Sequence, residues 1–202
     1  MLFHLPLAGS TFKKVYYDQL LGRAVSKFIP AEDLIVPYTA TSLDDAEAII
    51  HSLKVSENDL RKQQVNGFYS DVELGPPGVD NNDELTKKER ELSGSKKSGK
   101  QEPVYTVLEC HVNLDLEGFE DIDGENQPTG IKLPYIVTVE EGSRKVLSIR
   151  RNYAPDDLKK NKIQYFVHFK FLPGLGFYGF GLIHMIGGLS RTATAALRQL
   201  LD

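Results

Sequence analysis

Apolar residues recur with the period of β-strands through the first third of the chain. Residues 12–17 (FKKVYY) and 23–29 (RAVSKFI) predict two strands of a hairpin, joined by a loop of about five residues. Pro30 and Pro37 bracket the segment AEDLIV, which predicts a third short strand. Residues 46–55 (AEAIIHSLKV) fit either a strand or a helix, and we favour a strand because a helix signal follows at once.

That helix signal begins at Ser56. The run S-E-N-D places Asp59 at the third helical position, so Ser56 is a good N-cap for a helix that extends to about Val65. Asn66-Gly67 then supplies the residues that end helices.

The pattern of apolar positions is lost between residues 76 and 102. This stretch opens with two prolines, contains one charged helix candidate at 83–92, and closes on a Ser/Gly/Lys run that can bury almost nothing. We expect an exposed, mobile insertion. The cluster of Lys96, Lys97 and Lys100 could contact phosphate, but we favour a solvated linker because no aromatic residue interleaves the charges to stack on bases.

Strict alternation returns at residues 104–114, which predict a strand with one well-buried side. The side that we expect to be buried consists of Val104, Thr106, Leu108, Cys110, Val112 and Leu114. Cys110 would then be a small buried hydrophobic residue. Residues 135–139 and 145–150 predict a hairpin, and residues 163–171 predict a further strand of the same antiparallel sheet.

The chain closes on a helical pattern. Ala195, Ala196, Leu197, Leu200 and Leu201 share one apolar face, and the sequence stops at Asp202 with no glycine, asparagine or proline to end the helix. We therefore expect a truncated C-terminal helix, as in a piece of a larger protein.

These elements predict an α+β fold: a mainly antiparallel sheet with a few short helices and the C-terminal helix. The expected organisation is a β-rich part at 1–75, the insertion at 76–102, and a sheet, a Gly/aromatic segment and the helix at 103–202. We expect 1–75 and 103–202 to form one domain.

Three glycines of the Gly/aromatic segment match a nucleotide-binding pattern. Gly174, Gly176 and Gly179 spell G-x-G-x-x-G after a strand and before a helix. Pro173 stands before the first glycine, and the chain ends before a second strand could carry an acid for the ribose. We therefore favour tight turns and close packing over cofactor binding.

The other polar candidates do not form a recognisable site either. The loop with Glu117, Glu120, Asp121, Asp123 and Glu125 is rich in oxygen ligands, but Gly124 falls too early for a calcium-binding EF-hand loop, so we favour a solvated acidic turn. The histidines lack metal-ligand spacing; they are His4, His51, His111, His168 and His184. Ser10 and Ser190 lie outside any nucleophile-elbow pattern. The sequence predicts no catalytic residue, no cofactor site and no metal site.

Composition is that of ordinary globular material, with 41% hydrophobic, 26% charged and 9% aromatic residues. The net charge of −4 argues against a surface that coats DNA, which needs a concentrated basic face. Cys110 is the single cysteine, which excludes an internal disulfide. The apolar run at 177–189 is shorter than the roughly 20 residues that span a bilayer, and we expect no membrane partner.

Four long stretches resemble the portal proteins of short-tailed, podovirus-type bacteriophages. They are HLPLAGSTFKKVYYD, AEDLIVPY, LRKQQVNGFYSDVEL and YFVHFKFLPGLGFYGFGLIHMIGGLSRTATAALRQLLD, in the order of the family. The resemblance covers nearly the whole chain and is weakest at 78–102.

The resemblance implies a structural role without catalysis. Portal proteins form a ring of subunits at one vertex of the capsid of the virion, after synthesis in the cytoplasm of the bacterial host. Their partners are the packaging ATPase (terminase), capsid and tail adaptor proteins, and double-stranded DNA that passes through the channel without sequence specificity. Intact members are longer and add stem, clip and crown elements, so this chain would represent part of the wing-like body.

For this chain, the resemblance implies that the Gly/aromatic segment and the helix pack the body and contact neighbouring subunits. The residues expected there are Phe177, Tyr178, Phe180, Leu182, Ile183, Leu189, Leu197 and Leu200. Two alternatives remain open. One is a stand-alone soluble α+β binding module, a prophage remnant without catalytic activity, which would be monomeric. The other is an enzyme that holds a nucleotide at the glycines, which NAD or ATP would stabilise against heat.

Overall fold

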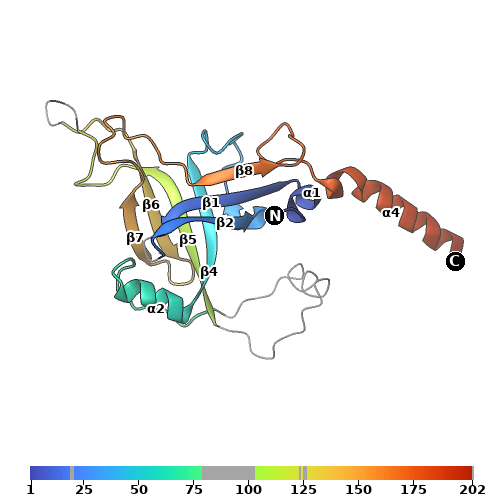
Figure 1. Cartoon of the computed structure of the whole chain (residues 1–202), viewed down its shortest axis with the longest axis horizontal. Coiled ribbons are helices and arrows are strands. Elements are labelled where there is room, and N and C mark those ends of the chain that lie inside the picture. Colours follow the sequence, from blue (N-terminus) through green and yellow to red (C-terminus); the bar gives the residue numbers. More distant parts are fainter. Residues whose placement is uncertain (19–20, 79–102, 123, 125–126, 202) are drawn as a thin grey trace. The chain divides into compact units, whose positions relative to one another are not determined.

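The computed structural model describes residues 1–18, 21–78, 103–122, 124 and 127–201 (Figure 1). The described chain is α+β, with eight strands and three α-helices. The predicted helix at 83–92 and the lysine cluster at 96–100 lie outside the described residues. The elements are α1 (His4–Ala8), β1 (Ser10–Asp18), β2 (Arg23–Pro30), the 3₁₀ turn η1 (Ala31–Asp33), β3 (Leu34–Ile35), β4 (Ala48–Ser56), α2 (Glu57–Val65), β5 (Val104–Leu114), β6 (Leu133–Glu140), β7 (Val146–Arg151), β8 (Phe166–Lys170) and α4 (Leu182–Leu201).

The chain divides into two compact units. Unit 1 comprises Met1–Ile50, Val112–Pro134 and Asn152–Asp202. Unit 2 comprises His51–His111 and Tyr135–Arg151. Each unit therefore combines segments that are distant in the sequence.

Unit 1 contains a three-stranded antiparallel sheet in the order β2-β1-β8. The predicted hairpin is confirmed, because β1 pairs with β2 over its length and sets Phe12 opposite Ile29. On its other side β1 pairs with β8 and sets Phe12 opposite His168. Phe12 is fully buried at the centre of this core, whose other buried members are Ile29, Leu34, Ala40, Leu43, Ala46, Ile49, Phe166 and Phe177.

The position of β8 corrects one prediction. Residues 163–171 do contain a strand, but it pairs with β1 instead of joining β5, β6 and β7. The physical reason is that Phe166, only 2% exposed, packs in the same core as Phe12. A strand pattern shows which residues alternate, whereas the partner strand is chosen by burial between distant segments.

The second sheet has five strands in the order β3-β4-β5-β6-β7. The predicted hairpin at 135–150 is confirmed as β6 and β7, whose register shifts between Thr138 and Val139. The favoured strand at 46–55 is confirmed as β4. The predicted strand at 31–36 is mostly wrong, because Ala31–Asp33 forms a 3₁₀ turn and only Leu34–Ile35 is extended.

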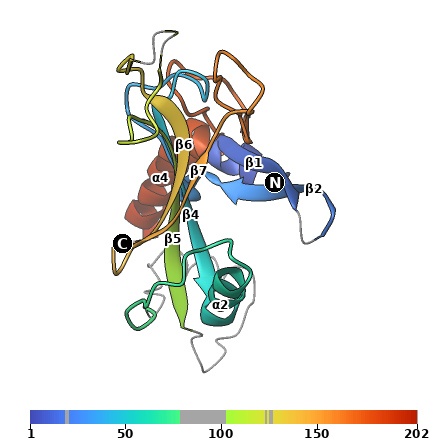
Figure 2. The ribbon, with the colours of Figure 1, turned by 90° about the vertical axis from the view of Figure 1, so that its left-hand side faces the viewer.

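The buried side of β5 is the opposite of the predicted one. Tyr105 and Val107 pack with Leu60 of α2 in the core of unit 2, and α2 lies beside β5 in both views (Figure 2). Glu109 and His111 are on this buried side too, at 8% and 4% exposed, with Oε1 and Nε2 2.7 Å apart. Cys110 is on the other side and only partly buried. The prediction chose the wrong side because Glu109 and His111 make the side of β5 that faces α2 look polar in the sequence.

Helix α2 begins and ends as predicted. The Ser56 hydroxyl accepts a hydrogen bond from the Asp59 N–H at 3.2 Å, and Gly67 follows the helix at a φ of 73°. Beyond it, the Ser70 N–H donates to Leu147 O of β7 at 2.7 Å.

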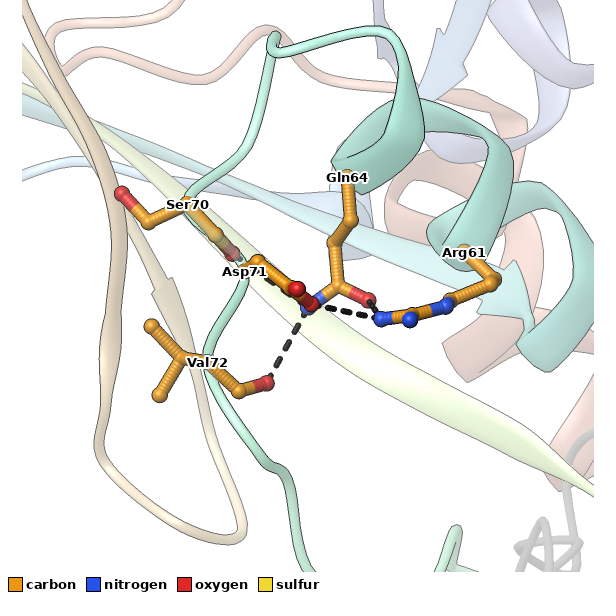
Figure 3. A network of polar contacts seen from close by, with 5 residues as sticks. All are labelled: Arg61, Gln64, Ser70, Asp71 and Val72. Atoms are coloured by element: carbon orange, nitrogen blue, oxygen red, sulfur yellow. Dashed lines mark hydrogen bonds and ion pairs between the residues drawn. The ribbon is translucent and has the colours of Figure 1, made fainter.

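A side-chain network ties α2 to the segment 70–72 (Figure 3). The buried Gln64 amide donates from Nε2 to Ser70 O at 3.3 Å and to Val72 O at 3.1 Å. Arg61 Nη1 donates to Gln64 Oε1 at 3.1 Å and to Asp71 Oδ1 at 2.6 Å. Arg61 and Asp71 are largely exposed, so their ion pair contributes little, and the buried amide carries most of the connection.

We predict that Gln64→Ala lowers the free energy of unfolding by about 1–3 kcal/mol, because it removes the donor to two backbone carbonyls beside the helix. Urea unfolding measures the change. Gln63→Ala is the matched control, since Gln63 is the neighbouring glutamine of the same helix and is less buried. Equal losses for the two variants would contradict the assignment.

Candidate functional site

A stack of three rings holds the Gly/aromatic segment against the sheet of unit 1. His168 of β8 packs on Phe12, at a centroid distance of 4.4 Å, and on Phe177, at 4.8 Å, and the rings of Phe12 and Phe177 also contact each other at 5.9 Å. Phe177 is 6% exposed and belongs to the core of the unit. The segment after β8 is therefore folded back onto β1 and β8.

A buried hydroxyl ties the same elements together. Ser10 Oγ accepts the N–H of Gly179 at 2.8 Å and lies 3.0 Å from His168 Nε2. Burial, and secondarily the charge of Lys170, lower the pKa of His168 to about 4, so the ring is neutral at physiological pH. A neutral Nε2 can accept the Ser10 proton while Ser10 accepts from Gly179. Ser10 is 1% exposed, which leaves a substrate no access to this Ser–His pair.

Three glycines bring two backbone segments into direct contact, and we call this contact the glycine clasp (Gly9, Gly179 and Gly181). A Cβ on Gly179 would meet Gly9 O at 2.6 Å, and one on Gly181 would meet Leu7 O at 2.3 Å. Gly9 also ends α1 in the left-handed region, at a φ of 86°. Only glycine fits at these crossings.

Close packing explains two of the three glycines of the G-x-G-x-x-G pattern. Gly179 is part of the clasp, and Gly174 packs against Phe180, whose ring would lie 2.9 Å from an added Cβ. Nothing lies within 4 Å of the Cβ position of Gly176. Two of the three glycines thus permit close packing.

Helix α4 begins at the clasp, where α1 contacts it (Figure 1). His184 Nδ1 accepts the N–H of Gly181 at 3.0 Å, which satisfies one free donor at the start of the helix. From Leu182 to Leu201 the helix contains no acidic residue, and its two arginines are Arg191 and Arg198.

The structure exposes seven of the eight residues expected at subunit contacts. Phe177 is the exception, since it is in the core. Tyr178 is half exposed and its hydroxyl donates to Leu34 O at 3.3 Å. The exposed fractions of the others are 50% for Phe180, 39% for Leu182, 55% for Ile183, 73% for Leu189, 61% for Leu197 and 82% for Leu200. A row of large apolar side chains facing solvent is typical of interaction surfaces, so the predicted role of these residues in subunit contacts stays a prediction that their exposure permits.

Two of the remaining polar candidates, Asp121 and His4, have structural partners. Asp121 forms an ion pair with Lys160 and accepts from Thr129 Oγ1 at 2.8 Å, and these bonds, Lys160 first, lower the pKa of Asp121. Asp123 and Glu125 lie outside the described residues. Ser190 is exposed on α4, and the ring of His4 packs on Phe28 at 5.4 Å. Over the part of the chain that the structure describes, His, Cys, Asp and Glu side chains form no group that could hold a metal ion.

Sequence reasoning singled out residues of α4, whose role in subunit contacts stays a prediction, and it missed the clasp. The pairing of Ser10 with His168 joins residues 158 positions apart, and the crossing partners of Gly179 and Gly181 lie even farther away in the chain. A glycine in the sequence indicates that another backbone segment can approach closely, but it does not indicate which segment this is.

A comparison with protein families identifies one whose model, described as "Phage SU10 portal protein", matches residues 13–202. A search of curated proteins found no match. Within the described residues, no helix has the length and apolar character needed to cross a membrane.

We predict that Gly181→Ala lowers the free energy of unfolding by about 1–3 kcal/mol, because the new methyl group forces apart two backbones that the clasp holds in contact. Urea denaturation provides the measurement. Gly176→Ala is the matched control in the same segment, with open space at its Cβ and an expected change within about 0.5 kcal/mol. A Gly181→Ala variant as stable as Gly176→Ala would show that the clasp is loose.

We predict that stability declines as the pH falls from 6.5 toward 4, in part through His168. The folded state binds a proton at His168 more weakly than the unfolded chain does. The loss of stability that results is therefore absent above pH 6.5 and grows as the pH drops toward 4. His168→Phe keeps a ring in the stack and removes the titration. Its loss of stability over this range, measured by urea unfolding at several pH values, should be smaller than that of the wild type.

At neutral pH the same variant should be about 1 kcal/mol less stable, since it loses the hydrogen bond to Ser10. An unchanged pH dependence in His168→Phe would assign the decline to the carboxylates instead.

Proposed function

We propose that this chain, which belongs to the phage SU10 portal protein family, forms part of the body of the ring at the capsid vertex through which DNA is packaged and ejected and to which the tail attaches. The family match over residues 13–202 supports a structural role in the virion. In this proposal the packaging ATPase, capsid proteins and tail adaptor proteins are its partners, and catalysis is no part of its role.

The observation that carries the proposal for this chain is the exposed apolar row of α4. Burying one Leu or Ile side chain stabilises a structure by about 1.5–3 kcal/mol. Covering the several exposed apolar side chains of α4 would therefore stabilise an assembly substantially. Surfaces of this kind are covered by other proteins in an assembly. We propose that Tyr178, Phe180, Leu182, Ile183, Leu189, Leu197 and Leu200 contact the neighbouring subunit, while Phe177 packs inside its own.

The charge of the chain fits a channel better than a DNA clamp. A net charge of −4 gives little drive to release counterions from DNA, and tight binding would oppose sliding. We propose that DNA passes this protein without sequence-specific contacts.

We predict that the purified chain associates as its concentration rises, and that Leu189→Glu shifts this association to at least tenfold higher concentration. The substitution places a charge in the centre of the apolar row, where burial would desolvate it. Light scattering across a concentration series measures the mass. Ala195→Glu is the matched control, because it adds the same charge at an exposed position about 120° around α4 from Leu189. The helical period thus corrects the prediction that Ala195 shares the apolar face of Leu197 and Leu200.

Equal association of Leu189→Glu and the wild type would remove α4 from the subunit contact. A monomeric wild type at all concentrations would place the subunit contacts outside this chain's α4.

A further inference from the structure

The sheet β2-β1-β8 has a second side that faces away from its core. Strand residues alternate between the sides, so Phe12 points into the core while Lys13, Val15 and Tyr17 point outward. Thr11 is on the same side but is only 1% exposed, so this end of the side is covered. The register sets Phe28 of β2 and Val167 of β8 on either side of Lys13. All three strands therefore contribute to one continuous outward side.

This side, which we call the outer sheet face, is rich in apolar and aromatic residues. Val15 is 43% exposed, Tyr17 65%, Phe28 37% and Val167 45%, and Phe169 is partly buried among them. Among the outward residues of these strands that the structure describes, Lys13 carries the only charge, and its Nζ lies 5.9 Å from the centroid of the Phe169 ring. Such a face is suited to contact with another apolar surface.

Helix α4 carries a surface of the complementary kind. At 100° per residue, one side of about 120° holds eight apolar residues and no charge. These residues, which we call the helix face, are Leu182, Met185, Ile186, Leu189, Ala193, Ala196, Leu197 and Leu200. Arg191 and Arg198 project from the opposite side. A helix of this pattern packs on an apolar sheet with its arginines left in water.

The described residues leave most of both surfaces uncovered; the exceptions on the outer sheet face are Thr11, which is buried, and Phe28, on which the ring of His4 packs. The large side chains of the helix face are 39% to 82% exposed, and Val15, Tyr17 and Val167 are at least 43% exposed. One chain thus carries an uncovered apolar helix and an uncovered apolar sheet, which together make a two-layer packing.

We propose that the helix face of one copy of this chain lies on the outer sheet face of the next copy. The inference rests on the proposed function, to which it adds the surface that receives α4. Because the two surfaces differ, the contact is head-to-tail, and repetition closes into a ring or continues as a filament.

The small size of the contact explains why a closed ring would be more stable than a pair of subunits. A 20-residue helix is about 30 Å long and 10–12 Å wide, so a helix lying on a sheet buries roughly 900 Å² in total, counting both surfaces. Stable interfaces bury about 1,200–2,000 Å², so a single contact should be weak. Each subunit of a closed ring makes two such contacts, which favours the closed assembly over pairs.

Two exposed substitutions separate this arrangement from pairing between two α4 helices. Leu189→Glu breaks the helix face, and Val15→Lys breaks the outer sheet face. Sedimentation velocity is measured for each variant alone and for their equimolar mixture, up to about 1 mM, where a contact of about that dissociation constant is half formed. Ile149→Lys is the control, since Ile149 of β7 is 50% exposed in unit 2. Circular dichroism confirms that each variant is folded.

The expected result is that each variant alone is monomeric, while the mixture forms a species of twice the mass and nothing larger. In that mixture the intact helix face of Val15→Lys can bind the intact outer sheet face of Leu189→Glu. The other two surfaces of this pair carry the substitutions, so no third copy can add. Ile149→Lys should associate like the wild type.

Association of Val15→Lys alone would overturn the inference while leaving α4 as a contact, because helices would then pair with helices or dock elsewhere. Unchanged association of Leu189→Glu would overturn both this inference and the proposed role of α4. A mixture that stays monomeric, or a monomeric wild type, would also overturn the inference.

Discussion

Direct contact between two backbones, at the glycine clasp, is the constraint on which the arrangement of unit 1 depends. Leu7–Gly9 and Gly179–Gly181 approach more closely than any side chain would allow. Ser10 extends this contact, since its hydroxyl accepts from Gly179 and reaches His168 inside the ring stack. The clasp, the hydroxyl and the rings together fix the point from which α4 starts. The exposed apolar surface of the helix is therefore presented from an ordered base.

Local signals in the sequence were sufficient for most elements. Ser56 predicted the start of α2 through its side-chain oxygen, and the first hairpin followed from alternating apolar residues. Helix α4 was visible from the 3.6-residue period of its apolar residues. Each of these features depends on residues within a few positions of one another, which is why the sequence alone reveals them.

What could not be predicted depends on distant partners. The pairing of β8 with β1 requires Phe166 and Phe12 to share a core, and no local pattern specifies that choice. The buried side of β5 was misassigned because Glu109 and His111 lie on it, and their mutual contact lets two polar residues occupy a position read as exposed. The glycine clasp could not be predicted for the same reason, since its glycines are distant in the sequence and only the fold brings them together.

The clasp also makes the beginning and the end of the described chain mutually dependent. Residues 7–9 precede the family match, which starts at residue 13, yet they form half of the support for the base of α4. A change in the spacing between Gly9 and β1 would displace the backbone that Gly179 and Gly181 contact. Variation in the short segment before β1 is therefore tied to the geometry of a helix that begins more than 170 residues later in the chain.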